Sequence, residues 1–196
     1  MMSDSNSFKD HRSTDYNEVL LCDINGNYKS TKDKLQAHLD GDLHIAFSVQ
    51  LVRPSKGKQN GIELLLQRRA EGKYHSEGLW TNTCCSHPLI NESLEVACKR
   101  RVREELNIEL TSPIKKITEF TYRAELDNGL VEHEYDHLFI VYQDVSECVA
   151  NPFEVSETQW LHLDDIVHAI SNNPEHFSAW FPAVFEHVKT YDLLNR

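Results

Sequence analysis

The sequence contains no apolar run approaching the roughly 20 residues that a membrane-spanning helix requires. Its first 18 residues, MMSDSNSFKDHRSTDYNE, are polar and lack the apolar core of a signal peptide. Cysteine is also scarce, because only 5 are scattered along the chain, an odd number that does not suit a disulfide framework. We therefore expect a cytoplasmic protein in a reducing setting, with no membrane insertion.

Positive charge is in short supply as well. The chain has 20 lysines and arginines against 31 aspartates and glutamates, a net charge of −11, which opposes general binding to nucleic acid. A basic cluster must therefore be held against an acidic background. The stretch QRRAEGK supplies one, with Arg68, Arg69 and Lys73. These side chains either face solvent, as such residues commonly do, or bind a phosphate or diphosphate.

The length and composition suit one globular domain. With 196 residues, 40% of them hydrophobic and 26% charged, the chain can bury a sizeable core. We expect a mobile tail at residues 1–17 and a single domain at residues 18–196. Neither an internal repeat nor a linker is evident in the sequence.

Short apolar stretches bounded by turn residues predict strands at residues 19–24, 43–52, 62–69, 114–126, 130–143 and 158–163. Two pairs of these strands form predicted hairpins, one around RPSKGKQNG and one around DNG. Helical patterns predict helices at residues 30–38, 91–106, 164–173 and 177–194, with Asn91 and Ser178 as N-caps of the second and the last. Together they predict an α+β fold with a mixed sheet between helices.

The stretch LWTNTCCSHPL places Cys84 beside Cys85 and follows them with His87. Adjacent cysteines are poor disulfide partners because a normal bridge needs their Cα atoms farther apart. Either both residues pack as small hydrophobes, or one presents a thiol beside an imidazole. On an extended backbone the two side chains point in opposite directions.

The stretch EHEYDH lies inside an apolar predicted strand. Strand alternation puts Glu132 and Glu134 on one face, where two carboxylates repel unless a cation lies between them or one keeps its proton. A solvent-facing acidic stripe is the alternative, but the flanking apolar runs favour a buried, metal-bound pair. His38, His44 and His87 complete a set of three imidazoles and two carboxylates that suits Mn²⁺, Zn²⁺ or Mg²⁺, although each histidine alone is more often an ordinary polar residue.

The predicted helix at residues 91–106 is highly charged. Arg100, Glu104 and Glu105 lie within one and a half turns of each other, so the two carboxylates can point into one site with an arginine nearby, or the helix is simply solvated. With its upstream residues it resembles the Nudix box, from which it departs at Ser86, Arg101 and Asn107. Arg101 replaces a glutamate that helps to hold the catalytic metals of Nudix hydrolases, which argues against hydrolysis.

Six motifs together resemble type I isopentenyl-diphosphate isomerases: AHLDGDLHIAF, QRRAEGK, WTNTCCSHP, RRVREELNIE, EHEYDHLF and HFSAWF. The resemblance extends from about Val19 to the last helix and implies a Nudix-type α/β/α sandwich with a mixed β-sheet. It also implies an enzyme that interconverts isopentenyl and dimethylallyl diphosphate, for isoprenoid biosynthesis, through a tertiary carbocation. One family feature is missing, because Ser76-Glu77 stands where the family has an aromatic residue and proline.

The resemblance further implies a role for individual residues. Cys85 and Glu134 match the opposed acid and base, Tyr122 a tyrosine beside the glutamate, and Glu105 and the Cys85 carbonyl the groups that hold Mg²⁺ on the diphosphate. The set His38, His44, His87, Glu132 and Glu134 matches a second metal site, for Mn²⁺, Zn²⁺ or Mg²⁺. The expected substrate-binding residues are Lys34, Arg69, Lys73, Arg101 and Trp180.

Three functional classes remain open from the sequence. The isomerase takes a small isoprenyl diphosphate and works as a monomer or homodimer. A Nudix pyrophosphohydrolase would cleave the diphosphate, and a non-catalytic Nudix-fold module would bind a ligand without needing Cys85 or Glu134.

Overall fold

The computed structural model describes residues 17–57, 61–126, 128–146 and 148–195. The expected tail at residues 1–17 lies outside this part except for Asn17. Among the described residues, no helix combines the length and the apolar character needed to cross a membrane.

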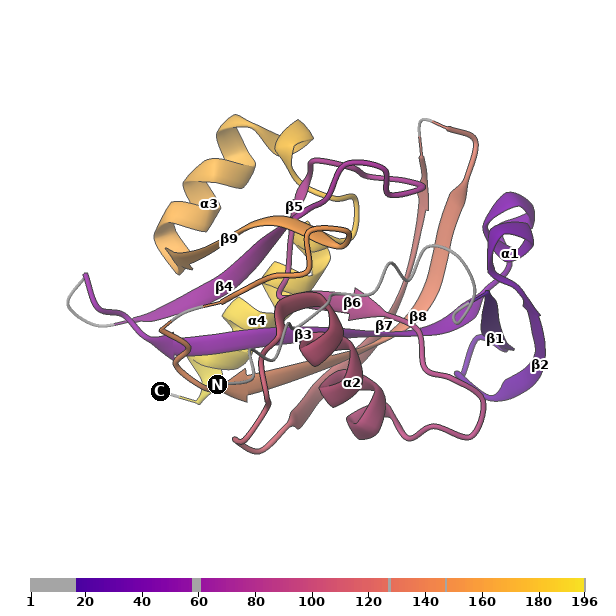
Figure 1. Cartoon of the computed structure of the whole chain (residues 1–196), viewed down its shortest axis with the longest axis horizontal. Coiled ribbons are helices and arrows are strands. Elements are labelled where there is room, and N and C mark those ends of the chain that lie inside the picture. The colour runs from indigo at the N-terminus through magenta and orange to yellow at the C-terminus, as the bar shows by residue number, and fades with distance from the viewer. Residues whose placement is uncertain (1–16, 58–60, 127, 147, 196) are drawn as a thin grey trace, which may run out of the picture.

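Nine strands of one sheet and four α-helices make up the described part of the chain (Figure 1). The strands are β1 (Glu18–Cys22), β2 (Tyr28–Asp33), β3 (His44–Pro54), β4 (Ile62–Arg69), β5 (Trp80–Thr81), β6 (Cys84–Ser86), β7 (Lys115–Glu125), β8 (Val131–Tyr142) and β9 (Val155–His162). The helices are α1 (Lys34–Asp40), α2 (Leu94–Leu106), α3 (Leu163–Asn172) and α4 (Phe181–Leu194), with a 3₁₀ turn at Pro174–His176.

The sheet is mixed, as predicted. β3 pairs antiparallel with β4 and β6, and it pairs parallel with β8. The two predicted hairpins are confirmed as β3–β4 and β7–β8. Because β3 pairs with both β6 and β8, it brings these two strands together. It is also buried along most of its length, so they meet inside the molecule.

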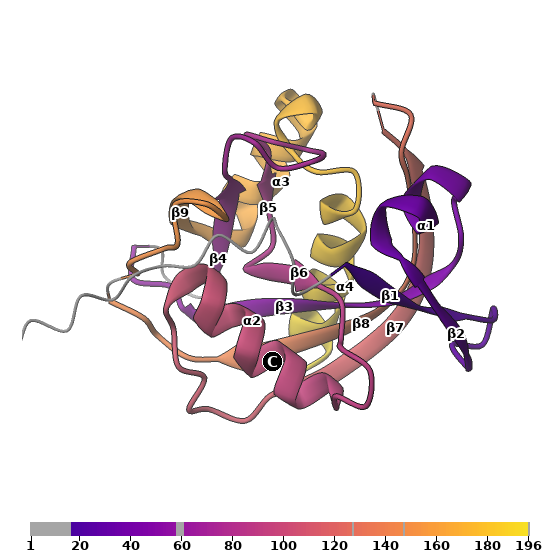
Figure 2. The same cartoon turned by 45° about the vertical axis from the view of Figure 1, so that its right-hand side comes forward.

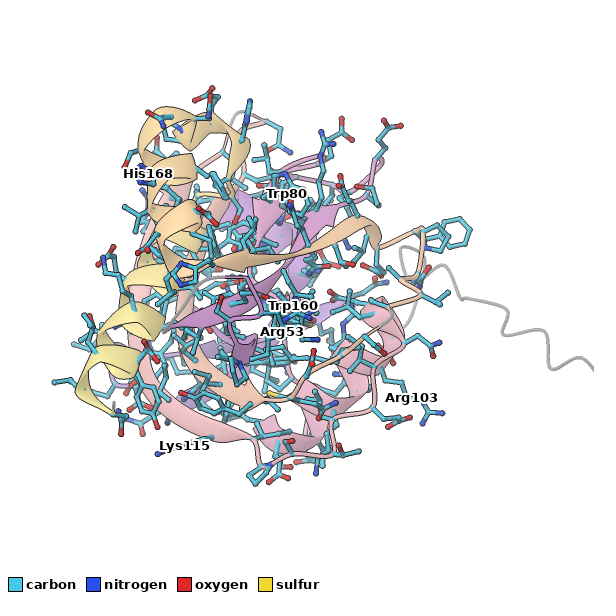
Figure 3. The ribbon with its side chains drawn as sticks, turned by 90° about the vertical axis from the view of Figure 1, so that its left-hand side faces the viewer. Arg53, Trp80, Arg103, Lys115, Trp160 and His168 are labelled. Atoms are coloured by element: carbon cyan, nitrogen blue, oxygen red, sulfur yellow. The ribbon has the colours of Figure 1, made fainter. Side chains whose placement is uncertain are left out.

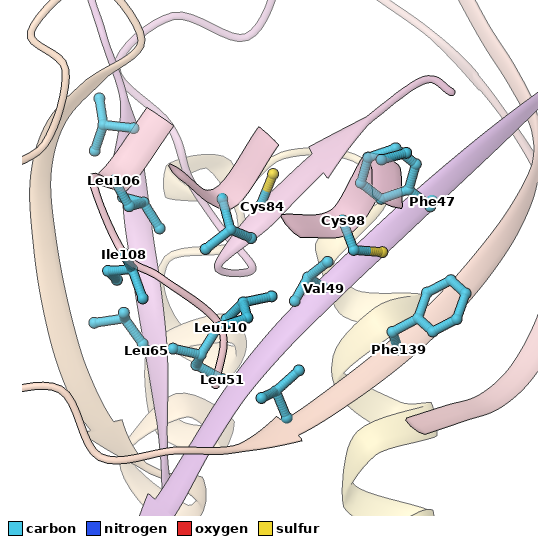
Figure 4. Packing of buried hydrophobic residues seen from close by; sticks show 14 residues of the cluster. Phe47, Val49, Leu51, Leu65, Cys84, Cys98, Leu106, Ile108, Leu110 and Phe139 are labelled. Atoms are coloured by element: carbon cyan, nitrogen blue, oxygen red, sulfur yellow. The ribbon is translucent and has the colours of Figure 1, made fainter. Parts of the chain in front are cut away.

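Helices cover both faces of the sheet (Figure 2). One apolar core lies between the sheet and α2, and it contains Phe47, Val49 and Cys98 (Figure 4). The other core lies between the opposite face and helices α3 and α4, with Leu138 and Phe181 among its members. This three-layer arrangement confirms the expected α/β/α sandwich.

Alternation along β6 sends its two cysteines to different layers. Cys84 is fully buried in the α2 core, whereas Cys85 packs against the α4 core and is partly accessible. Burial in apolar surroundings suits Cys84 as a small hydrophobe. The expectation that the two side chains point in opposite directions is confirmed.

Two predicted helix starts are wrong because local capping favours other residues. The helix expected at residues 30–38 begins at Lys34, since β2 continues to Asp33, whose carboxylate accepts a hydrogen bond from the Gln36 amide at 2.9 Å. Helix α2 has Ser93 as its N-cap, and Asn91 lies earlier with a φ of 62°.

The predicted cap of the last helix is also wrong. Helix α4 begins at Phe181 after Trp180, and the Ser178 hydroxyl donates to the Thr81 hydroxyl at 2.9 Å instead. The last strand is longer than predicted: β9 begins at Val155 and packs Trp160 under Arg53, whose guanidinium lies 4.3 Å from the ring centroid (Figure 3).

Candidate active site

A cavity of about 50 Å³ opens between the ends of β4, β6, β7 and β8 and the start of α1. Its lining includes every residue that the sequence resemblance implies for catalysis and substrate binding: Cys85, Tyr122, Glu134, Lys34, Arg69, Lys73, Arg101 and Trp180. A wider cleft of about 400 Å³ shares Lys34, Lys73 and Arg101 with it. The cavity therefore joins a thiol and carboxylates to a second region in which Lys34, Lys73 and Arg101 lie near Glu154.

Cys85 lies opposite Ser48 in the β3–β6 ladder. The Ser48 hydroxyl lies 3.6 Å from the Cys85 sulfur and donates a hydrogen bond of 2.7 Å to Asp136. Burial raises the pKa of the Cys85 thiol well above its usual range, and the charge of Glu134 raises it further. The thiol therefore keeps its proton near neutral pH.

Glu134 comes from β8, where His44 on β3 and Tyr122 on β7 are its cross-strand neighbours. The Tyr122 hydroxyl donates to the carboxylate at 2.5 Å, and Nε2 of His87 lies 3.0 Å from its other oxygen. Burial alone would raise the pKa of Glu134, but His44 and the Tyr122 hydroxyl outweigh it and lower the pKa to about 2. This carboxyl group is therefore ionised.

Asp136 is a third carboxyl group on the same buried face of β8. It follows Glu134 at the strand period of two, and its Oδ1 makes no hydrogen bond within the described part of the chain. Burial, followed by the charge of Glu134, raises the pKa of Asp136 to about 8. The strand thus carries a neutral acid directly beyond an ionised one.

The histidines converge on Glu134. The ligand atoms of His38, His44, His87 and Glu134 all lie within 4.8 Å of one another, and His38, His75 and Glu132 form an adjoining group. Nδ1 of His38 and Nδ1 of His44 each bind a backbone carbonyl, at 2.7 and 2.8 Å, which directs the Nε2 lone pairs inward.

These donors fit a divalent cation. Nε2 of His44 is buried and makes no hydrogen bond within the described residues. Burial lowers the pKa of His87 well below its usual range, so its imidazole is neutral and able to act as a ligand. Burial alone would lower the pKa of His44, but Glu134 beside it outweighs burial and raises that pKa, so a bound cation would displace a proton from His44. Imidazoles and carboxylates together are the donor set that transition metals and zinc prefer.

A second group of charges surrounds Arg101 of α2. Its guanidinium contacts Glu104 at 2.8 Å and Glu105 at 2.7 Å, and Gln67 donates to the other oxygen of Glu105 at 3.0 Å. Glu105 lines the cavity. Arg100 lies near these carboxylates, as expected, at 3.4 Å from Glu104, and its guanidinium also forms a two-bond ion pair with Glu92.

The basic cluster is only partly as predicted. Arg69 and Lys73 line the cavity, but Arg68 points outward, half-exposed, and donates to the Gly78 carbonyl at 2.8 Å. The two arginines are neighbours on β4, so strand alternation separates them. Burial and the nearby charges of Lys73 and Arg101 lower the pKa of Lys34 to about 8.

Trp180 forms an apolar wall of the cavity. It is buried, its indole N–H donates to the Asn82 side chain at 3.3 Å, and its ring lies 5.4 Å from the Arg69 guanidinium. The sequence reasoning did not identify the neighbouring Tyr74, His75 and Glu154, which also line the cavity. They lie in loops, where no periodic pattern marks a buried position.

Comparison with known proteins gives the chain a family. The NUDIX domain model matches residues 42–181. The chain is 47% identical over 171 residues to an isopentenyl-diphosphate Delta-isomerase of Photobacterium profundum, covering 87% of this chain and 93% of that protein. An isopentenyl-diphosphate Delta-isomerase of Pectobacterium atrosepticum is 41% identical over 175 residues, covering 89% and 92%.

Solved structures agree on the fold. A crystal structure of a Deinococcus radiodurans protein superposes with a TM-score of 0.68 at 16% identity, covering 86% of this chain and 97% of that chain. A MutT protein from Methanosarcina mazei gives a TM-score of 0.60 at 21% identity, covering 76% and 95%. The chain has the Nudix fold and belongs to the family of isopentenyl-diphosphate Delta-isomerases.

Proposed function

We propose that the protein interconverts isopentenyl and dimethylallyl diphosphate in the cytoplasm, as a supply for isoprenoid biosynthesis. The curated relatives carry the name of this activity. The single observation that carries the proposal is that Cys85 of β6 and Glu134 of β8 line the same small cavity, together with the Trp180 indole and four lysine and arginine side chains.

The proposed chemistry moves a carbon–carbon double bond that no carbonyl group activates. The alkene takes a proton at its terminal carbon, which leaves a tertiary carbocation, and a base then removes a proton from the carbon on the other side. Such a reaction requires one proton donor and one acceptor at the same substrate. Cys85 and Glu134 are the proposed pair: in the free protein the raised pKa of the thiol keeps Cys85 protonated and the lowered pKa of the carboxyl group keeps Glu134 ionised. Whichever residue donates the proton in one direction accepts it in the other.

The cavity wall suits a cation. Trp180 presents an aromatic ring, and a desolvated cation–π contact contributes roughly 1–2 kcal/mol. A substrate that fills the small cavity would displace water, which would otherwise capture a carbocation. The Tyr122 hydroxyl orients the Glu134 carboxylate through its hydrogen bond.

Two divalent ions fit the residues present. His38, His44, His87, Glu132 and Glu134 would hold Mn²⁺, Zn²⁺ or Mg²⁺, and Glu105 with the Cys85 carbonyl would hold Mg²⁺ against the diphosphate. The ions would orient the Glu134 carboxyl group, tune its acidity and neutralise phosphate charge. Lys34, Arg69, Lys73 and Arg101 would bind the diphosphate and so hold the five-carbon chain in register by contacts remote from the reacting carbons.

The ion pairs of α2 argue against hydrolysis. Arg101 stands where Nudix hydrolases have a glutamate, and its guanidinium binds both Glu104 and Glu105. The helix therefore presents less free carboxylate to metal ions than a complete Nudix box would.

The proposal is tested by incubating the protein with isopentenyl diphosphate and Mg²⁺ in D₂O and following the products by NMR. We expect dimethylallyl diphosphate that carries deuterium, and no released phosphate. Cleavage of the diphosphate would indicate a hydrolase. Binding without turnover by metal-reconstituted protein would indicate a non-catalytic module.

Replacing each of the adjacent cysteines separates chemistry from packing. We expect Cys85→Ala to abolish turnover, because it removes the only thiol that lines the cavity among the described residues. Cys84→Ala is the matched control and should retain most of the activity, since Cys84 packs in the α2 core. Equal losses in the two variants, measured as kcat at saturating substrate, would contradict the assignment of Cys85.

A further inference from the structure

His75 is a buried imidazole that none of the recognised motifs includes. It lies in the loop between β4 and β5, and only 4% of its side chain is exposed. Its Nε2 atom lies 2.8 Å from Oε1 of Glu132, whereas Nε2 of His38 lies 3.8 Å from the same oxygen. Among these imidazoles, that of His75 is therefore the one within hydrogen-bond distance of Glu132.

The position of the ring proton follows from the two neighbours of His75. Its Nδ1 lies 3.1 Å from the Ser76 hydroxyl, which can either donate or accept. A carboxylate can only accept, so Nε2 must carry the proton in order to bond Glu132, and the Ser76 hydroxyl then donates to Nδ1. Ser76 lies in the left-handed region, with a φ of 51°, and this conformation keeps its hydroxyl beside the ring.

The ring is held in place on its other sides. It contacts the Trp180 ring edge-on at a centroid distance of 5.8 Å and stacks on His38 at 6.0 Å. The backbone carbonyl of His75 accepts a hydrogen bond of 3.0 Å from Arg69. An imidazole that is packed and bonded in this way approaches its partner with little conformational freedom left to lose.

Each glutamate of the proposed metal centre thus has its own hydrogen-bond donor. Glu134 receives the Tyr122 hydroxyl at 2.5 Å, and that hydroxyl is 3.5 Å from Glu132. Glu132 instead receives His75 at Oε1, the oxygen that also lies 3.8 Å from Nε2 of His38, and each carboxylate oxygen has a second lone pair that can bind an ion. A second hydrogen-bonding group behind a ligating carboxylate typically contributes 10- to 100-fold in metal affinity.

We propose that His75 is a positioning residue of the metal centre, which donates its Nε2 proton to Glu132 and so holds this carboxylate in the orientation that binds the divalent ion. The inference rests on the metal site of the proposed function but not on isomerisation. It places His75 outside the coordination sphere of the ion, as a residue additional to the five implied ligands.

The test measures the affinity of the full-length protein for Zn²⁺ by competition with a chromophoric chelator. We expect His75→Leu to weaken binding by about 10- to 100-fold, because the leucine cannot donate to Glu132. His75→Gln should retain an affinity within a few-fold of the unmodified protein, because its amide N–H can donate. The matched control is His168→Leu on the exposed face of α3 (Figure 3), which should leave the affinity unchanged.

The visible absorption of the Co²⁺-substituted proteins distinguishes positioning from ligation. We expect both His75 variants to keep the band positions of the unmodified protein, because the directly bound atoms are the same. Shifted bands in both variants, with no rescue of affinity by glutamine, would make His75 a ligand and overturn the proposal. Unchanged affinity in His75→Leu would also overturn it. Because none of these readouts is turnover, failure of the isomerase assay would leave the test of His75 intact.

Discussion

At the scale of single residues, the cavity places ionisable groups in opposite protonation states within one small volume. Burial dominates at Cys85, where no described cation opposes it strongly enough to lower the thiol pKa. Hydrogen-bond donors dominate at Glu134, which is more deeply buried than Cys85 but receives the Tyr122 hydroxyl and lies beside His44. Whether a group in this cavity is protonated or ionised therefore depends more on the hydrogen-bond donors and charges beside it than on how deeply it is buried.

Lys34 gives the site a predicted pH dependence. Its pKa of about 8 in the free protein arises from burial and from the neighbouring cations Lys73, Arg101 and Arg69, and a bound diphosphate would raise that pKa by supplying negative charge. Substrate binding therefore favours the protonated lysine. We expect KM for isopentenyl diphosphate to be constant below about pH 8 and to rise by up to about tenfold per pH unit above it, as measured by initial rates.

The control for this prediction is Lys34→Arg, because a guanidinium keeps its charge throughout the range. Its KM should stay level between pH 7.5 and about 9.5. A rise of KM in the variant that matches the rise in the unmodified protein would show that another group titrates.

At the scale of elements, the short helix α1 carries two residues of the proposed site. Lys34 and His38 are four positions apart and therefore share a face. The helix has only seven residues, between the Asp33 cap and Gly41 with a φ of 67°, so its own hydrogen bonds contribute little stability. Its caps accordingly matter more than those of a long helix.

We expect Asp33→Ala to destabilise α1 by about 1 kcal/mol, because the alanine cannot accept the Gln36 amide. The loss should appear as weaker metal binding through His38 and a higher KM through Lys34, with kcat less affected. Asp33→Asn is the control, since asparagine caps equally well. Equal KM and metal affinity in the alanine and asparagine variants would contradict a role for the cap.

The elements also show what sequence patterns can and cannot predict. Alternation along β8 correctly put Glu132 and Glu134 on one buried face, and the helical pattern correctly predicted that α2 ends at Leu106. Which residue caps a helix depends on the positions of a few atoms, which a sequence pattern does not specify. The predictions of Asn91 and Ser178 as N-caps were wrong for this reason. His75 was missed because its loop has no period, and its burial depends on Trp180, about a hundred residues later in the chain.

At the scale of the whole molecule, the proposed metal centre joins segments that are far apart in the sequence. His38 lies on α1, His44 begins β3, His87 follows β6, and both glutamates lie on β8. In Figure 1, α1 with β1 and β2 forms one end of the molecule, beside the start of β8. An ion bound to all of these segments would tie that end to the central sheet.

Metal binding should therefore stabilise the fold. A ligand that binds only the native state raises the free energy of unfolding by about 2.7 kcal/mol when its free concentration is 100 times its Kd. For a chain of this length, 1 kcal/mol raises Tm by about 2–4 °C, so we expect removal of the metal by a chelator to lower Tm by roughly 5–10 °C. Calorimetry with and without added Zn²⁺ or Mn²⁺ measures this shift.

The variant His87→Asn separates specific from general effects of the metal on stability. Its side chain removes an implied ligand at the mouth of the site while leaving the buried pair His38 and His44 in place. Because an incomplete ligand set binds more weakly, its Tm should respond to added metal less than that of the unmodified protein. If the Tm of both proteins responded equally, the stabilising ion would bind at a site other than this one. If neither Tm responded, the proposed metal centre, and the orientation of Glu134 by its ion, would be contradicted.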